Sequence, residues 1–346
     1  MKKYILLVLS FCLGIAVLMG LDPAEVSAAT APTTVNYSVS PEAANNQIDK
    51  KITYYDLKVT PGQTETIKFK INNNDTTGHT YSVAINRATT DVNGVIDYTR
   101  NNVKPDSDLK YNIEKLVTYP KKVSVAAKSS KEVAVKLQMP NGNFSGELLG
   151  GILVDENDQV NNKAPKGVTL KSKYDYVIGL QLQQGTAAVK SDLKLDKVYE
   201  TSQKGQIYLD DDLDNDVPKL EKNVSIKARV TPVNSNKTIL SANKKNMSLA
   251  PDSDFNYPVD INTTTGTKRN NRLKPGTYVM YLDAKANNGQ NLWNFKRKFT
   301  ISKVQNKHVN KVAPNNADAK WLVIGIVAAL IAVASGIVWY YRRNRK

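Results

Sequence analysis

Hydrophobic and polar residues alternate in short runs along the middle of the chain. One run contains Ile67, Phe69 and Ile71, and another spans residues 224–230. Alternation with a period of two places apolar side chains on one face of a β-strand. No stretch between residues 30 and 302 sustains the period of an α-helix. The pattern therefore predicts an all-β fold.

Turn residues separate these runs at regular intervals. Pro61-Gly62 and Asn288-Gly289 are predicted turns, because proline fixes φ and glycine accepts a positive φ. Further strands are predicted over Tyr81–Asn86, Val123–Val125, Val133–Leu137, Gly146–Val154, Tyr174–Leu182 and Tyr278–Ala284. Short strands at this spacing are typical of antiparallel sandwiches. We expect two tandem immunoglobulin-like β-sandwich domains.

The first residues have the layout of a secretory signal peptide. Lys2 and Lys3 precede an apolar stretch that ends near Gly20, and a run of small residues reaches Ala29. A basic start, a short apolar core and small residues at the cleavage site define such a peptide. We expect cleavage at Ala28 or Ala29, with the chain exported.

The last residues predict a membrane anchor. Residues 321–341 carry no charge, with Trp321 at one end and Trp339 and Tyr340 at the other. A span of about 20 apolar residues crosses the hydrocarbon core, and aromatic residues prefer its two interfaces. Arg342 and Arg343 follow directly, and such a basic cluster stays in the cytoplasm. The protein is therefore expected to cross the cell membrane once, with its N-terminus on the cell-wall side.

These features divide the chain into six parts. We expect a signal peptide (1–29), a first β-sandwich (30–187), a second β-sandwich (188–302), a polar tether (303–320), a transmembrane helix (321–341) and a cytoplasmic basic tail (342–346). The boundary at residue 187 follows from the alternating run over 174–182, which we assign to the first sandwich. The tether spans at most about 60 Å, so the exported part is expected to reach the inner wall.

Charge and residue usage narrow the classes of function. The whole chain has a net charge of +16. Residues 320–346 contribute +5 and residues 1–29 contribute zero, so the exported part carries +11. This favours anionic neighbours such as wall polymers or lipid headgroups, although a basic surface that only keeps the protein soluble is an equal alternative. Export removes nucleic acid as a partner.

The mature chain lacks cysteine and has only two histidines, which are the side chains most used in nucleophilic catalysis and zinc binding. The single cysteine, Cys12, leaves with the signal peptide, and only His79 and His308 remain as histidines. Neither has a second histidine or a cysteine with which to share a metal, and a Ser-His-Asp triad would have to use one of them. Both are expected to be solvated loop residues. Most hydrolase and metalloenzyme chemistry is therefore disfavoured.

Three motifs follow one another along the chain: Tyr37–Asn73 (YSVSPEAANNQIDKKITYYDLKVTPGQTETIKFKINN), Asn93–Thr99 (NGVIDYT) and Asn143–Val154 (NFSGELLGGILV). In this order they resemble the motifs of the WxL-interacting proteins of low-GC Gram-positive bacteria. The resemblance implies a peptidoglycan-binding first domain and a host-binding second domain. The implied partners are wall-located proteins with Trp-x-Leu motifs. This chain has no such motif, since Trp293 precedes Asn294 and Phe295, which fits the receptor side of the pair.

A polar and aromatic segment is the candidate ligand site. Asn46, Gln47 and Asp49 supply hydrogen-bonding groups, and Tyr54 supplies a stacking face. Such a combination suits a glycan. Alternation places Tyr55 inward and Tyr54 outward. The other interpretation, which we favour, is an N-terminal strand and loop without a binding role.

An acidic run is the only candidate for a cofactor site. Asp210, Asp212, Asp214 and Glu221 have the spacing of positions 1, 3, 5 and 12 in an EF-hand calcium loop. The sixth position holds Asn215 where that loop needs glycine. We favour a strand edge that runs into a solvated turn over a calcium site, and no other cofactor is expected.

Two glycines interrupt the apolar run GELLGGILV. Gly150 and Gly151 lack the order of a phosphate-binding loop, and no helix follows them. Glycine inside a strand commonly marks a close approach of another stretch of backbone. We predict such an approach here.

The sequence thus indicates a non-enzymatic surface protein that binds peptidoglycan and WxL-type surface proteins and links the membrane to the wall. A stand-alone adhesin, for example for a host extracellular-matrix protein, is the first alternative. A wall hydrolase that uses carboxylates alone is the second and weaker alternative.

Overall fold

The structure is a computed structural model that describes residues 35–106, 109–157, 174–185, 187–203, 206–261 and 273–303. The predicted signal peptide and transmembrane helix lie outside these residues, together with Trp321, Trp339, Tyr340, Arg342 and Arg343. Among the described residues, no helix has the length and apolar character needed to span a membrane. The described helices are two short 3₁₀ turns, η1 (Ile113–Lys115) and η2 (Asn287–Gly289).

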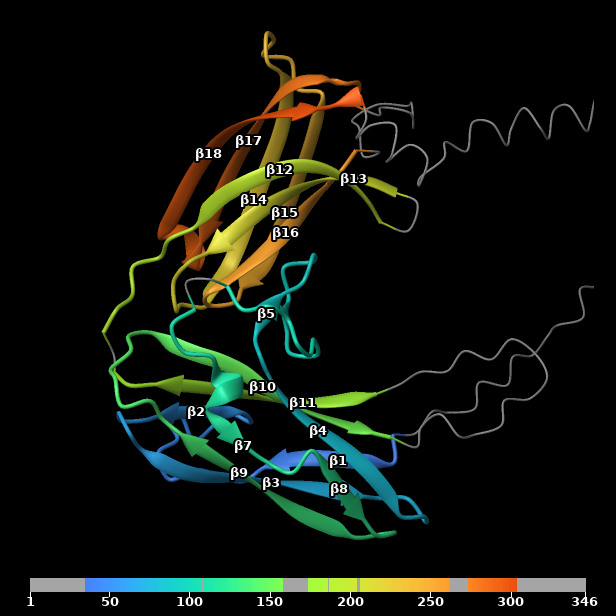
Figure 1. Cartoon of the computed structure of the whole chain (residues 1–346), viewed down its shortest axis with the longest axis vertical. Helices are drawn as coiled ribbons and strands as arrows, with labels where there is room; N and C mark the ends of the chain where they lie inside the picture. The colour runs from blue at the N-terminus through green and yellow to red at the C-terminus, as the bar shows by residue number, and fades with distance from the viewer. Residues whose placement is uncertain are drawn as a thin grey trace, which may run out of the picture. The chain divides into compact units, whose positions relative to one another are not determined.

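The first domain is a sandwich of two sheets (Figure 1). One sheet has the order β1–β3–β9–β7, with strands Tyr37–Pro41, Thr64–Asn73, Ser130–Gln138 and Val117–Thr118. The other has the order β2–β11–β10–β4–β8, with strands Tyr55–Lys58, Asp175–Gln183, Glu147–Glu156, His79–Arg87 and Lys122–Val125. The β2–β11 pair is parallel. A hairpin of β5 (Thr89–Thr90) and β6 (Ile96–Asp97) follows β4.

The core of the first sandwich follows from the alternation in the sequence. Ile67, Phe69 and Ile71 are buried on β3, as predicted, and Ile152 of the other sheet is buried as well. The Tyr37 hydroxyl of β1 donates a hydrogen bond to the β10 main chain and so joins the two sheets. Burial of one large aliphatic side chain contributes about 1.5–3 kcal/mol. The apolar faces of β3 and β10 therefore hold this domain together.

The second domain is also a sandwich, immunoglobulin-like as expected. Its smaller sheet has the order β12–β13–β16, with strands Lys194–Gln203, Gln206–Asn215 and Ser253–Asp260. Its larger sheet has the order β15–β14–β17–β18, with strands Leu240–Leu249, Glu221–Pro232, Gly276–Ala286 and Asn291–Ile301. Val230, Met280 and Leu282 of the larger sheet share one core with Leu209 and Leu213 of the smaller.

Two predicted turns are confirmed by backbone geometry. Gly62 has φ of +71° between β2 and β3, and Gly289 has φ of +85° between β17 and β18. In the second turn Asn288 also has a positive φ, of +60°. Residues at these positions need the left-handed region, which glycine and asparagine enter at low cost.

The β5–β6 hairpin of the first domain contacts the second domain. The Gly94 carbonyl accepts a hydrogen bond of 2.8 Å from the Ser248 amide, and the Thr90 hydroxyl accepts one of 2.9 Å from the Ala250 amide. Gly94 has φ of +69°, and the Met247 side chain fills the place of a Cβ there. The described residues of both sandwiches fall within one compact unit. The motif NGVIDYT thus supplies part of the contact between the domains.

Candidate functional site

The side chain of Gln47 shapes its own loop. Its amide nitrogen donates to the main-chain oxygens of Asp49, at 3.1 Å, and Tyr54, at 2.9 Å. Its amide oxygen accepts from the Asp56 amide at 3.4 Å. The Asp49 carboxylate in turn accepts from the Lys51 amide at 2.9 Å. Gln47 and Asp49 therefore hold the loop in shape.

Asn46 is also occupied by local contacts. Its amide nitrogen donates to the Lys58 carbonyl at 2.9 Å and to a Glu65 carboxylate oxygen at 2.5 Å. These bonds fix the loop to β2 and β3. Of the four residues singled out in the sequence, Tyr54 alone presents its side chain to solvent as a large apolar surface.

Tyr54 lies outside the sandwich and its neighbour inside. The exposed fraction is 40% for Tyr54 and 1% for Tyr55, which confirms the orientation predicted by alternation. Tyr54 lies over Gly179 of β11, where an added Cβ would be 3.4 Å from the Tyr54 Cβ. The glycine leaves room for the tyrosine to lie close to the sheet.

A second tyrosine lies over the neighbouring strand. Gly151 of β10 pairs with Gly179 of β11, and an added Cβ on Gly151 would be 2.6 Å from the Tyr98 ring. The Tyr98 carbonyl accepts a hydrogen bond of 2.8 Å from the Asn86 side chain. Burial, chiefly, raises the pKa of Tyr98 to about 12, with a further contribution from Tyr54. Because adjacent strands are about 4.8 Å apart, the two tyrosines lie close together.

Polar groups surround the two rings. The Gln183 side chain donates a hydrogen bond of 2.7 Å to the Asp56 carboxylate. Burial raises the pKa of Tyr54, and the nearby charges of Asp56, Asp49 and Glu147 raise it further. We call Tyr54, Tyr98, Asp56, Glu147 and Gln183 the tyrosine surface. It offers the exposed ring of Tyr54 and several hydrogen-bond acceptors on the outer face of one sheet, with the half-buried ring of Tyr98 beside them.

Sequence reasoning found only one member of this surface. Tyr98 and Glu147 lie within the motifs NGVIDYT and GELLGG, so their motifs were singled out but their side chains were not. The predicted close backbone approach is confirmed at Gly150, which faces the Asn86 carbonyl, whereas Gly151 faces the side chain of Tyr98. The pairing of Gly151 with Gly179, which brings the two tyrosines together, is a long-range contact that no local pattern shows.

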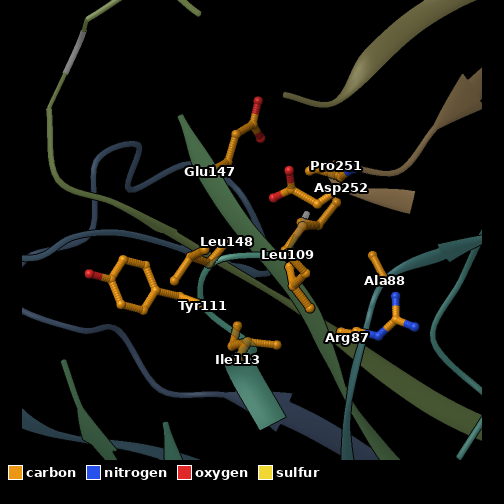
Figure 2. A pocket seen from close by; sticks show the side chains of 10 residues that line it. Arg87, Ala88, Leu109, Tyr111, Ile113, Glu147, Leu148, Pro251 and Asp252 are labelled. Atoms are coloured by element: carbon orange, nitrogen blue, oxygen red, sulfur yellow. The ribbon is translucent and has the colours of Figure 1, made fainter. Parts of the chain in front are cut away.

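A small cavity lies beside Glu147 (Figure 2). Its volume is about 20 Å³, and its walls include Arg87, Tyr111, Glu147 and Asp252. One Glu147 oxygen accepts from the Leu220 amide at 3.3 Å, and Arg87 donates to the Lys104 carbonyl at 2.6 Å. Such a volume holds about one water molecule. The cavity is too small for a sugar ring, so it is not itself a glycan site.

The acidic run proposed as a calcium loop lies on a strand. Asp210, Asp212 and Asp214 occupy alternate positions of β13, the central strand of its sheet. Glu221 begins β14, is buried, and accepts a hydrogen bond of 2.5 Å from the Asn287 side chain. Burial raises the pKa of both Asp210 and Asp214 to about 6, with neighbouring carboxylates adding to the shift. Within the ranges that the structure covers, no three His, Cys, Asp or Glu residues are grouped to hold a metal.

The predicted strand edge is corrected by this topology. β13 lies between β12 and β16, so it is the central strand of its sheet and not an edge. Its Leu209 and Leu213 point into the core. Between them Asp211 is fully buried, and neither of its carboxylate oxygens has a hydrogen-bond partner. Burial, and secondarily the charge of Asp210, raises the pKa of Asp211 far above its ordinary value. Asp211 thus lies without a hydrogen-bond partner in the core, an environment that disfavours its charged form.

The prediction for His79 is wrong. His79 begins β4 and is largely buried, with its ring nitrogens 2.9 Å from an Asp75 oxygen and 3.1 Å from a Glu156 oxygen. Two carboxylates therefore hold the imidazole in place at the end of the strand. His308 lies outside the described residues.

Two family models match the chain in sequence. Residues 37–156 match the WxL Interacting Protein, peptidoglycan binding domain, and residues 165–311 match the WxL Interacting Protein, host binding domain. The second match includes β11, which is paired with β10 and β2 of the first sandwich. The border between the two matched regions thus differs from the border between the two sandwiches. Comparison with curated proteins finds no match.

Solved structures show only a distant likeness. The CupB2 chaperone of Pseudomonas aeruginosa has 12% identity and a TM-score of 0.26, covering 68% of this chain and 91% of its own. The Salmonella enterica SafA pilin in complex with the SafB chaperone has 9% identity and a TM-score of 0.24, covering 70% and 98%. A PapD-like domain of human CEP192 has 15% identity and a TM-score of 0.27, covering 47% and 94%. These scores carry no argument about function.

The two family matches follow one another in the order that the motifs predict, and together they include both sandwiches. The chain belongs to the WxL-interacting protein family.

Proposed function

We propose that this chain is a non-enzymatic protein of the cell surface that binds peptidoglycan with its first domain and partner proteins with its second. The observation that carries the proposal is the exposed ring of Tyr54, seated over Gly179 beside Tyr98 on the domain that matches a peptidoglycan-binding model. The partners of the second domain are WxL-type surface proteins, and a host extracellular-matrix protein is a further candidate.

The tyrosine surface suits a polymer of sugars and short peptides. A flat aromatic ring offers an apolar face with a polar tip, which stacks on a sugar ring at a low cost in conformational entropy. The carboxylates of Asp56 and Glu147 accept hydrogen bonds from hydroxyl, amide or ammonium groups.

The arrangement favours binding over hydrolysis. Catalysis by two carboxylates needs a separation that admits a sugar and a water molecule between them. Glu147, the acid with a raised pKa in this region, accepts a main-chain hydrogen bond and borders a cavity with room for one water molecule. A sugar ring has no space there.

We further propose that the predicted helix over residues 321–341 anchors the protein in the membrane, with both domains outside. A tether of at most about 60 Å then confines binding to the inner wall. The protein would link the membrane to the wall and hold WxL-type proteins there.

Sedimentation with purified peptidoglycan, stripped of covalently attached polymers, tests the first half of this proposal. The full-length chain in detergent should sediment with the wall material, and Trp-x-Leu proteins from native membranes should sediment only when the chain is present. No sedimentation of the wild type would refute peptidoglycan binding. Release of soluble muropeptides by the chain would instead indicate a hydrolase.

A further inference from the structure

The outer face of the larger sheet in the second domain carries a cluster of positive charges around one aromatic ring. Arg229 of β14, Tyr281 of β17 and Lys296 of β18 lie side by side on three neighbouring strands. The central carbon of the Arg229 guanidinium lies 3.6 Å from the centroid of the Tyr281 ring, and the Lys296 nitrogen lies 5.6 Å from it. Cation–π attraction of this kind holds both cations near the ring.

Two further lysines extend the cluster along the strands. Lys227 lies two residues from Arg229 on β14, and Lys298 lies two residues from Lys296 on β18, and all four cations are exposed. Figure 1 shows β14, β17 and β18 in this sheet. We call Lys227, Arg229, Lys296 and Lys298, together with Tyr281, the basic face.

The four cations lack acidic partners among the described residues. The only carboxylate at the neighbouring outward positions is Asp283, which accepts a hydrogen bond of 3.0 Å from the Asn294 side chain. On the first domain, by contrast, Lys68 is 2.7 Å from Glu132 and Lys70 is 3.6 Å from Glu42. The basic face therefore keeps an excess of positive charge, because Asp283, opposite Lys227, offsets only one of its four cations, whereas the two lysines of the first domain are ion-paired.

We propose that the basic face binds a linear phosphodiester polymer. A guanidinium stacked on tyrosine keeps its in-plane N–H groups free, and these match two oxygens of one phosphate. Residues two apart on a strand are spaced by about 7 Å, and neighbouring strands by about 4.8 Å, so the cations form an array along which successive phosphates can bind.

Chemistry favours this ligand over a protein partner. The centre of a protein–protein interface is depleted of lysine and rich in apolar area, whereas three of the four cations here are lysines. A second copy of this chain could offer Asp212, Asp214 and Asp254 of β13 and β16, which are not buried, so self-association is one outcome of the test. The proposal concerns the second domain and does not depend on peptidoglycan binding by the first.

The test uses the full-length chain in detergent with poly(glycerol phosphate) as the probe, measured by biolayer interferometry between 50 and 200 mM NaCl. Four phosphate contacts should make log K fall against log salt with a slope of about −3. The double variant R229Q/K296Q should weaken binding at least tenfold at 50 mM NaCl and make the slope shallower. Arg229→Lys should give an intermediate loss.

A matched control is available on the first domain. The variant K68Q/K70Q removes the same number of exposed positive charges from an ion-paired sheet and should leave polymer binding within twofold of the wild type. Equal losses in the two double variants would overturn the proposal, since net charge alone would then explain binding. It would also be overturned by binding to phosphatidylglycerol vesicles without binding to the free polymer, or by self-association that R229Q/K296Q abolishes without any binding of the polymer.

Discussion

The ring of Tyr98 rests directly on Gly151, so that a Cβ at residue 151 would lie 2.6 Å from the ring. On the adjacent strand, Gly179 leaves an ordinary contact distance of 3.4 Å to Tyr54. Each of the two paired glycines therefore lies beneath a tyrosine, but only Gly151 has no space for a side chain. This difference separates two substitutions that look alike in the sequence.

Gly151→Ala should displace Tyr98 and weaken both stability and wall binding. The added methyl group forces the ring away, and such overpacking costs about 1–3 kcal/mol. Thermal unfolding and sedimentation with peptidoglycan would measure the two effects. Gly179→Ala is the matched control and should change neither by much. A Gly151→Ala protein with wild-type stability would contradict the seating of Tyr98.

Gly94→Ala should loosen the contact between the β5–β6 hairpin and the second domain. Alanine at φ of +69° is strained, and its Cβ meets the Met247 side chain. The left-handed conformation alone costs about 1–2 kcal/mol. Calorimetry should show a lower melting temperature, and trypsin should cut the chain faster.

Gly185→Ala serves as the control for that change, because nothing lies within 4 Å of its added Cβ and its φ is not in the left-handed region. Equal behaviour of the two variants would show that the hairpin contact contributes nothing to stability.

Asp211 should make the protein less stable as the pH rises. Burial raises its pKa far above the ordinary value, so the folded protein keeps a proton that the unfolded chain releases above about pH 4. Stability is then full below that pH and is lost as the pH rises toward the folded pKa, by up to about 1.4 kcal/mol per pH unit. Asp211→Asn, which carries no charge, should remove this loss.

The difference between the wild type and Asp211→Asn in urea unfolding from pH 6.5 to pH 8 isolates the effect of Asp211. Asp210 and Asp214, whose pKa values are raised to about 6, act in the same direction in both proteins. The wild type should lose stability across this window and Asp211→Asn should lose less. Parallel curves for the two proteins would show that Asp211 is ionised or paired in the folded state.

The fold could be predicted from the sequence because alternation is a local signal. Ile67, Phe69 and Ile71 point inward on β3 as expected, and Tyr54 and Tyr55 point to opposite sides. His79 was mispredicted because it follows a segment rich in Asn, Asp and Gly that is typical of a turn, while one of the two carboxylates beside it, Glu156, is distant in the sequence. The central position of β13 was missed because the carboxylate of Asp211 interrupts the run of alternating apolar residues. In the structure Asp211 is nevertheless buried, like Leu209 and Leu213 on either side of it.

The candidate site could be predicted only in part. Tyr54 was found because its exposure follows from the strand period. Asp56, Glu147 and Gln183 come from three strands and meet through the pairing of β10 with β11 and of β11 with β2. Tyr98 follows β6 and reaches them by packing on Gly151. Such pairings depend on the whole sheet, so the other members of the tyrosine surface had no local signature. The basic face around Tyr281 was hidden for the same reason.

The affinity of Tyr54→Ala for purified peptidoglycan tests the central claim most directly. Sedimentation should show a dissociation constant at least tenfold weaker than that of the wild type, about 1.4 kcal/mol, with an unchanged melting temperature because the ring is exposed. Tyr199→Ala, which removes an exposed tyrosine from the second domain, should bind like the wild type. Equal affinities for Tyr54→Ala and the wild type would contradict the assignment of the tyrosine surface as the peptidoglycan site.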